Sequence, residues 1–176
     1  MKYFTLLLTL FIFTSCELIF PDPPEPELPP ITTTGENTFG AIVNGEIRST
    51  SSAFFITALH PRDSILQISG RMDGINSGRE ITLSLHISGI RIEEDFYETT
   101  PYLRPSFFLF AFNEDIEECY LDPRLDDGVI YEGNLEIIHL DRSNQIISGT
   151  FEYTISKPGC PEIKVTDGRF DLRYRI

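Results

Sequence analysis

Histidines and acidic residues are the side chains of this 176-residue chain best suited to catalysis or metal binding. The three histidines, His60, His86 and His139, are widely separated and form no local metal-binding motif. His86 lies on the polar side of an alternating apolar run, whereas His139 is in register with Leu135 and Ile137. We therefore expect a core or rim position for His139, and neither a metal ion nor a cofactor.

The 27 acidic residues cluster in several places. Paired carboxylates serve as acid and nucleophile in glycoside hydrolysis, and carboxylate-rich loops bind calcium. The segment 122–128 lacks the alternate-position spacing of an EF-hand loop, and the chain has neither a G-x-S-x-G elbow nor a phosphate-cradling loop. We expect solvated loops and no enzyme, and a hydrolase that uses paired carboxylates is the second alternative. The clusters are Glu93-Glu94-Asp95, Glu114-Asp115, Glu117-Glu118 and Asp126-Asp127.

Composition and charge narrow the class of protein. Hydrophobic residues make up 41% of the chain and aromatic residues 12%, which is enough for a packed core. The formal net charge of −13 repels phosphate backbones, so we expect no nucleic-acid partner. Beyond the leader, no run reaches the roughly 18 apolar residues that a transmembrane helix needs. We expect one folded unit over residues 39–176.

The first 15 residues predict a lipoprotein signal peptide. Lys2 precedes an apolar run that ends at Phe13 and is too short to span a bilayer. Small residues then precede Cys16, an arrangement that resembles a bacterial lipobox, in which cleavage occurs before a cysteine carrying diacylglycerol. Phe13 replaces the usual Leu, a departure common in Bacteroidota lipoproteins. We expect lipidation at Cys16 and an outer-membrane location on the periplasmic or surface-exposed face. An ordinary secretory signal is the alternative.

Residues 16–38 predict a lipidated tether between the membrane and the folded unit. The stretch PDPPEPELPP holds many prolines and acids, which favour extended polyproline II over helix or strand. Acidic residues soon after the lipidated cysteine loosely resemble a surface-export signal of this lipoprotein class. The membrane is therefore an expected partner, through the lipid.

Two more cysteines, Cys119 and Cys160, lie in loop-like contexts of a chain that we expect to be exported. Exported chains form disulfides, so we expect a bridge between the two residues, and two unpaired thiols are the alternative. Asp63-Ser64-Ile65 resembles the pattern for O-glycosylation in exported Bacteroidota proteins and makes Ser64 a candidate modification site. The alternative for Ser64 is a plain turn that leads into a strand.

Apolar residues alternate with polar ones along most of the chain after residue 38, as strands with one buried face require. The clearest runs are 81–88, 151–156 and 170–176, the last with Ile176 on its apolar side. Other strands are expected at 39–43, 46–50, 53–60, 64–71, 94–100, 106–113 and 129–140. We predict an all-β fold, namely an antiparallel two-sheet β-sandwich of about ten strands, with a partly open β-barrel as the alternative.

Several turns follow from local sequence. Asn44-Gly45 suits a two-residue hairpin with positive φ at both positions, residues 60–63 form a second turn, and residues 141–144 form a third. The buried parity changes between Val165 and Phe170, so a β-bulge or tight turn at 166–168 must absorb one residue, with Gly168 at positive φ.

The lipobox, the segment Thr38–Gly45, and two C-terminal segments, Ile147–Tyr153 and Val165–Asp171, together resemble a family of uncharacterised Bacteroidota lipoproteins. The resemblance implies one all-β domain and an envelope location, and it implies no activity or catalytic residue.

We expect a non-enzymatic interaction or accessory module. A small-ligand or glycan-binding module is the first alternative. Phe108 and Phe110 are its candidate contacts, because the run at 107–110 is apolar on both faces. A central strand buried on both sides would also explain that run.

Overall fold

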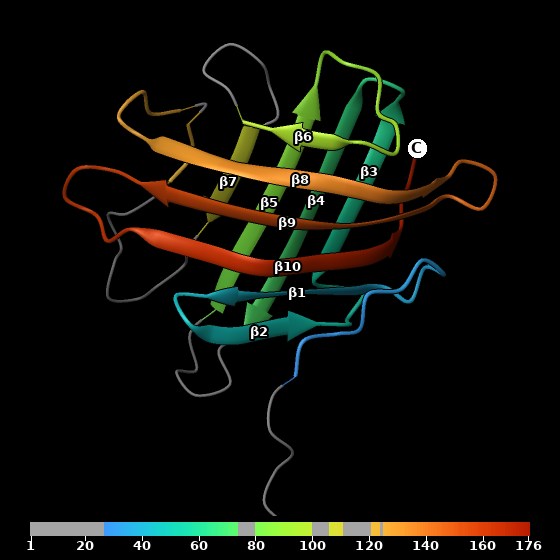
Figure 1. Cartoon of the computed structure of the whole chain (residues 1–176), viewed down its shortest axis with the longest axis horizontal. Coiled ribbons are helices and arrows are strands. Elements are labelled where there is room, and N and C mark those ends of the chain that lie inside the picture. Colours follow the sequence, from blue (N-terminus) through green and yellow to red (C-terminus); the bar gives the residue numbers. More distant parts are fainter. Residues whose placement is uncertain (1–26, 74–79, 100–105, 111–120, 124) are drawn as a thin grey trace, which may run out of the picture.

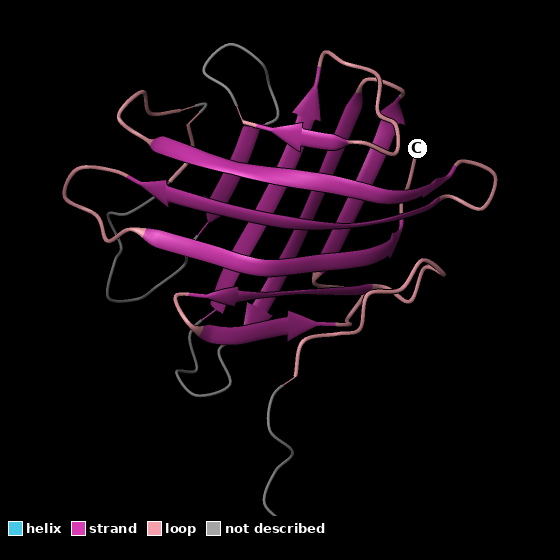
Figure 2. Ribbon diagram, viewed as in Figure 1, coloured by secondary structure: helices cyan, strands magenta, loops and turns pink. Residues whose placement is uncertain are grey.

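The computed structural model describes residues 27–73, 80–99, 106–110, 121–123 and 125–176, and the regular elements within these ranges are strands. Figure 2 shows them without an intervening helix. The strands are β1 Thr38–Val43, β2 Glu46–Thr50, β3 Ile56–Arg62, β4 Ile65–Asp73, β5 Glu80–Ser88, β6 Phe96–Glu98, β7 Ser106–Phe110, β8 Ile130–Asp141, β9 Ile146–Ser156 and β10 Ile163–Arg173.

The strands form two sheets in which neighbouring strands are antiparallel. Sheet A has six strands in the order β2-β1-β10-β9-β8-β6, and sheet B has the order β3-β4-β5-β7. The two sheets lie face to face, and their strands cross steeply (Figure 1). The chain is therefore all-β with a two-sheet sandwich architecture, as the alternating pattern predicts.

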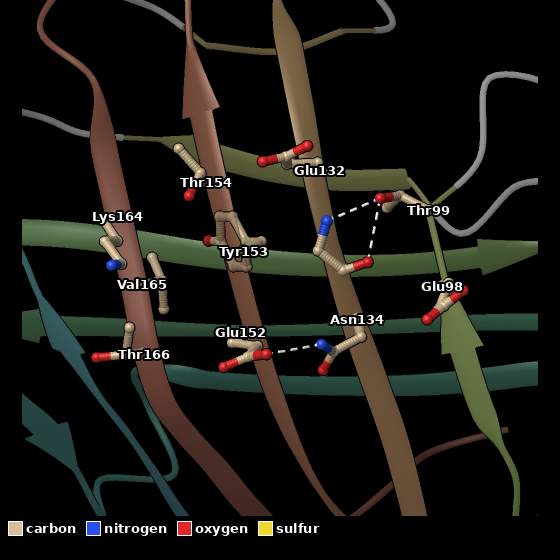
Figure 3. A pocket seen from close by; sticks show the side chains of 11 residues that line it. Glu98, Thr99, Glu132, Asn134, Glu152, Tyr153, Thr154, Lys164, Val165 and Thr166 are labelled. Carbon is tan, nitrogen blue, oxygen red and sulfur yellow. Dashed lines mark hydrogen bonds between the residues drawn. The ribbon is translucent and has the colours of Figure 1, made fainter.

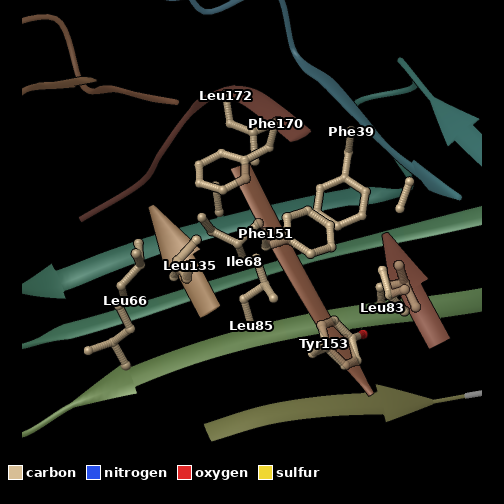
Figure 4. Close-up of a cluster of buried hydrophobic side chains, with 14 of the residues drawn as sticks. Phe39, Leu66, Ile68, Leu83, Leu85, Leu135, Phe151, Tyr153, Phe170 and Leu172 are labelled. Carbon is tan, nitrogen blue, oxygen red and sulfur yellow. The ribbon is translucent and has the colours of Figure 1, made fainter. Parts of the chain in front are cut away.

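The core lies between the sheets and is built by the residues that alternate inward. Leu83 and Leu85 of β5 are at most 1% exposed and face Phe151 of β9 across the interior. The Phe151 ring lies 5.4 Å from the ring of Phe39 and 6.4 Å from that of Phe170 (Figure 4). This aromatic row joins β1, β9 and β10, so sheet A is held by side-chain packing as well as by its ladder.

A β-bulge interrupts β10 where the parity of buried residues changes. Thr166 and Asp167 together oppose the single Glu152 of β9, which confirms the predicted irregularity. The predicted positive φ at Gly168 is wrong, because Asp167 adopts it instead, with φ of 51°. Aspartate tolerates this conformation better than most residues. Gly168 is needed for space: a Cβ there would lie 2.5 Å from the Phe151 ring and backbone oxygen.

The predicted hairpins hold at two places. Asn44 and Gly45 have φ of 50° and 85°, as a type I′ turn between β1 and β2 requires. The turn between β8 and β9 also lies where expected, and the Asp141 carboxylate accepts backbone hydrogen bonds from Ser143 and Asn144 at 2.8 and 3.0 Å.

The turn after β3 and the C-terminal end of β10 differ from the prediction. β3 runs through Arg62 because a bulge at His60-Pro61 accommodates the proline, so the turn is at Asp63-Ser64 and not at 60–63. The last apolar residue, Ile176, is 78% exposed because β10 ends at Arg173.

Residues 29–37, which we call the strap, lie against sheet A before β1 begins. The strap docks on Asp171, a fully buried carboxylate of β10. Asp171 accepts hydrogen bonds from the hydroxyl of Thr32 at 2.6 Å and from the backbone N–H of Gly35 at 2.8 Å. The backbone N–H groups of Thr34 and Glu36 add two more, each at 3.1 Å. The last part of the predicted tether is thus packed on the folded unit.

Candidate functional site

An open hollow of about 490 Å³ lies on the outward face of sheet A, over β6, β8, β9 and β10. Strand alternation explains its polar lining, because the neighbours of these residues in sequence point into the core. Figure 3 shows the polar lining side chains on the side of the sheet that faces away from sheet B, whereas Tyr153 and Val165 belong to the core. The lining includes Glu98, Thr99, Glu132, Asn134, Glu152, Thr154, Lys164 and Thr166.

Three carboxylates and one ammonium group set the charge of this hollow. Glu152 accepts a hydrogen bond from Asn134 Nδ2 at 2.9 Å (Figure 3). Within the part of the chain that the structure describes, Glu98 and Glu132 have no ion-pair partner. The backbone N–H of Lys164 donates to Asn44 Oδ1 at 2.7 Å, so the β1–β2 turn holds the strand that carries the ammonium group. The lining has a net negative charge.

The wall of the hollow at β6 is tied to β8 by one threonine. The Thr99 hydroxyl accepts from the backbone N–H of Gly133 at 2.8 Å and donates to its carbonyl at 3.1 Å. Tyr153 lies beneath the hollow, and its side chain is buried in the core. Burial raises the pKa of the Tyr153 phenol, so this side chain brings no charge to the hollow.

A second hollow of about 190 Å³ lies beside the first and reaches the strap. Asn134 and Glu152 line both hollows, and Ile31 of the strap lines the second. Arg169 borders it too, and donates to the carbonyl of Pro29 at 3.4 Å. We call the two hollows together the sheet A groove.

Three exposed hydrophobic residues surround the groove. Phe96 is 52% exposed and lies on the same side of β6 as Glu98, two residues away. Ile130 is 68% exposed and lies on the same side of β8 as Glu132, two residues away. Ile31 of the strap is 56% exposed. The groove therefore has an acidic centre with exposed apolar residues beside it.

Ser64 lies in the two-residue turn between β3 and β4 and is half-buried. Its carbonyl accepts the backbone N–H of Gly89 at 3.0 Å, and the neighbouring Asp63 carbonyl accepts that of Ile92 at 2.7 Å. The turn is thus tied to the loop after β5, which agrees with a plain turn. O-glycosylation of Ser64 stays a prediction.

The aromatic candidates Phe108 and Phe110 belong to β7, and their backbones pair with Ser84 and Thr82 of β5. Among the described strands of sheet B, β7 is outermost. The sheet A groove lies on the other sheet, and the ligand-binding role of the two phenylalanines stays a prediction.

Cys16 and Cys119 lie outside the described residues, so lipidation and the disulfide stay predictions. Cys160 lies in the connection between β9 and β10 and packs against the hydrophobic core.

The structure separates the three histidines. His60 is buried, with its Nδ1 2.7 Å from the carbonyl oxygen of Ile65, and His86 alternates with core residues of β5 as expected. A bulge at Ile138 takes His139 out of register with Leu135 and Ile137, so the predicted register is wrong. His139 lies at the rim, and its Nδ1 is 3.4 Å from Glu94 Oε1.

The acidic clusters that lie within the described residues brace loops. Glu94 accepts the backbone N–H of Leu140 at 2.9 Å. Asp126 pairs with Lys157 Nζ at 2.6 Å, and this hydrogen bond, followed by one from the backbone of Gly128, lowers the pKa of the carboxyl. The pairs at 114–118 lie outside the described residues.

Among the residues with described positions, no group of three or more His, Cys, Asp or Glu side chains is placed to hold a metal ion. The same ranges contain no helix with the length and apolarity to cross a bilayer. No protein-family model, curated protein or solved structure matches this chain. The class of the protein therefore rests on its own strands: it is an all-β domain of two antiparallel sheets.

Sequence reasoning missed the sheet A groove and the strap. Glu132, Asn134, Glu152 and Thr154 are recognisable in the sequence as the polar half of an alternating pattern. Every half-exposed strand shows that pattern, so it carries no information about where a sheet face is hollowed.

Proposed function

We propose that this chain is a lipid-anchored outer-membrane protein whose sandwich acts as a non-enzymatic binding module, with the sheet A groove as its binding surface. The observation that carries the binding role is the groove itself, a hollow of about 490 Å³ whose Glu98 and Glu132 have no ion-pair partner within the described residues. Exposed hydrophobic residues beside such a polar hollow favour an interaction surface over an ordinary solvated face.

The strap supports the anchored arrangement. Its hydrogen bonds to Asp171 hold residues 32–36 on β10, and the described N-terminal segment leaves the fold beyond β2 (Figure 1). An anchor at Cys16 would then tether the module from the side of sheet A at which Ile31 borders the groove. The family resemblance of the lipobox and of the C-terminal segments supports the same envelope location.

Lipidation is tested by Cys16→Ser. The variant precursor should stay unlipidated and should escape globomycin-sensitive processing, because it lacks the thiol that carries the lipid. Membrane retention and normal processing of the variant would contradict the anchor.

The binding role is tested by photo-crosslinking in intact host cells. A benzoylphenylalanine at position 132 on β8 should give a crosslinked product, whereas the same residue at position 80 on β5 should not. Glu132 and Glu80 are both exposed strand residues, on sheet A and sheet B respectively, which makes the comparison matched. Equal products at both positions, or none at position 132, would contradict a binding surface at the groove.

A further inference from the structure

We propose that the partner of the sheet A groove is an extended, basic polypeptide segment with apolar residues between its Lys or Arg side chains. This inference rests on the proposed function and deepens it, because it names the chemistry of the partner at the same surface.

The shape of the groove fits an extended chain. Its two hollows share Asn134 and Glu152, so the surface is continuous from β6 across β8 and β9 to β10 and the strap. Adjacent strands lie about 4.8 Å apart, so crossing these four strands covers about 14 Å. An extended peptide covers that distance with about four residues.

Charge complementarity selects a basic partner. Glu98, Glu132 and Glu152 line the larger hollow against the single Lys164. Glu152 keeps a hydrogen bond to Asn134, whereas Glu98 and Glu132 lack an ion-pair partner among the described residues. A chain with a net charge of −13 also attracts cationic partners over a distance of about one Debye length.

The exposed hydrophobic residues at the edges of the groove favour a partner segment with apolar residues between its Lys or Arg side chains. Phe96 and Ile130 lie beside Glu98 and Glu132, the two carboxylates without an ion-pair partner among the described residues, and Ile31 lies at the strap end. A segment that alternates basic and apolar side chains can reach both kinds of surface at once. Charge does not select a neutral oligosaccharide, and Tyr153, which lines the larger hollow, is buried, so Phe96 at the edge is the exposed ring that the described part of the groove offers for stacking.

The test measures binding of a fluorescent peptide of about eight residues that alternates Lys and Val to the whole chain in phosphatidylcholine nanodiscs. Fluorescence anisotropy should show saturable binding at about 20 mM NaCl and an affinity about tenfold lower at about 300 mM NaCl, because salt screens exposed charges. The variant Glu98→Gln/Glu132→Gln should bind about fivefold more weakly, as expected for the loss of two exposed ion pairs. The control variant Asp63→Asn/Glu80→Gln removes one carboxylate from the β3–β4 turn and one from β5, and should bind like the parent.

Three outcomes would overturn the inference: no saturable binding of the Lys-Val peptide, equal binding of a matched Glu-Val peptide, or equal weakening by both double variants. A neutral hexasaccharide probe that bound in place of the peptide, and lost affinity in Glu98→Gln/Glu132→Gln, would overturn the partner class and leave the binding role of the groove intact. The crosslinking comparison between positions 132 and 80 tests that role separately. Light scattering tests whether the chain self-associates. Self-association that Glu98→Gln/Glu132→Gln abolishes would overturn the inference, because the occupant of the groove would then be a second copy of the chain.

Discussion

The carboxylate of Asp171 accepts the backbone N–H of Gly35 at 2.8 Å, across 136 positions of the sequence. This bond holds the strap on β10, and the position of Gly35 favours glycine for two reasons. Its φ is +76°, and a Cβ there would lie 3.1 Å from Arg173 Cγ. The strap therefore belongs to the folded domain, and it brings Ile31 to the edge of the sheet A groove.

Replacing Asp171 with Asn should destabilise the domain by about 2–4 kcal/mol, because a buried carboxylate that accepts four hydrogen bonds becomes a neutral group with a misplaced donor. Urea unfolding measures the change. Asp167→Asn is the matched control, since Asp167 is exposed on the same strand and Asn also tolerates its φ of 51°. Equal stability of the two variants would show that the strap adds nothing to the fold.

Stability should fall in acid through the same carboxyl group. Burial by itself raises the pKa of Asp171, but the hydrogen bonds from Thr32 and from the backbone of Glu36, Gly35 and Thr34 outweigh it, so the pKa is lower than usual. The unfolded chain then binds the proton first, at a pKa of about 3.9. The stabilisation is present above that pH and is lost as the pH falls through the folded pKa.

The measurement is unfolding free energy against pH for the parent and for Asp171→Asn. The parent should lose more stability than the variant below about pH 4, and the two slopes should agree above about pH 5. Parallel curves throughout would contradict a lowered pKa at Asp171.

Gly168→Ala should destabilise the domain by about 1–3 kcal/mol, because the new methyl group would overlap the ring and backbone of Phe151, which is itself packed in the core. Gly45→Ala separates this effect from backbone strain. It places a methyl group in open space at a φ of +85°, so its effect reports conformation alone. Thermal unfolding compares both variants, and an unchanged melting temperature for Gly168→Ala would remove the steric argument.

The predicted bridge between Cys119 and Cys160 closes a separation of 41 positions and should stabilise the chain by about 4 kcal/mol in the chain-entropy model. Thiol counting on denatured, unreduced protein should find neither cysteine free. Reduction should lower the unfolding midpoint of the parent and leave that of Cys119→Ser/Cys160→Ser unchanged. Two free thiols in the parent would contradict the bridge.

Local pattern was sufficient for the fold class and for most strands. Leu83 and Leu85 are buried while Ser84 and His86 are on the other side of β5, because side chains alternate along any strand. The same rule located the β10 bulge, since a change of parity between Val165 and Phe170 requires an extra residue. The rule also applies to β8, where the change of parity between Ile137 and Leu140 marks the bulge at Ile138 that takes His139 out of the predicted register.

The alternation of apolar and polar residues is a property of neighbouring residues, so the sequence by itself predicted strands with one apolar face that pack as two sheets. The strap and the groove arise differently. The hydrogen bonds between Asp171 and Gly35 and between Glu152 and Asn134 depend on which strands pair and in which register. Burial, bond partners and hollows are properties of those long-range choices, so they emerged from the folded arrangement of the sheets and not from any local pattern.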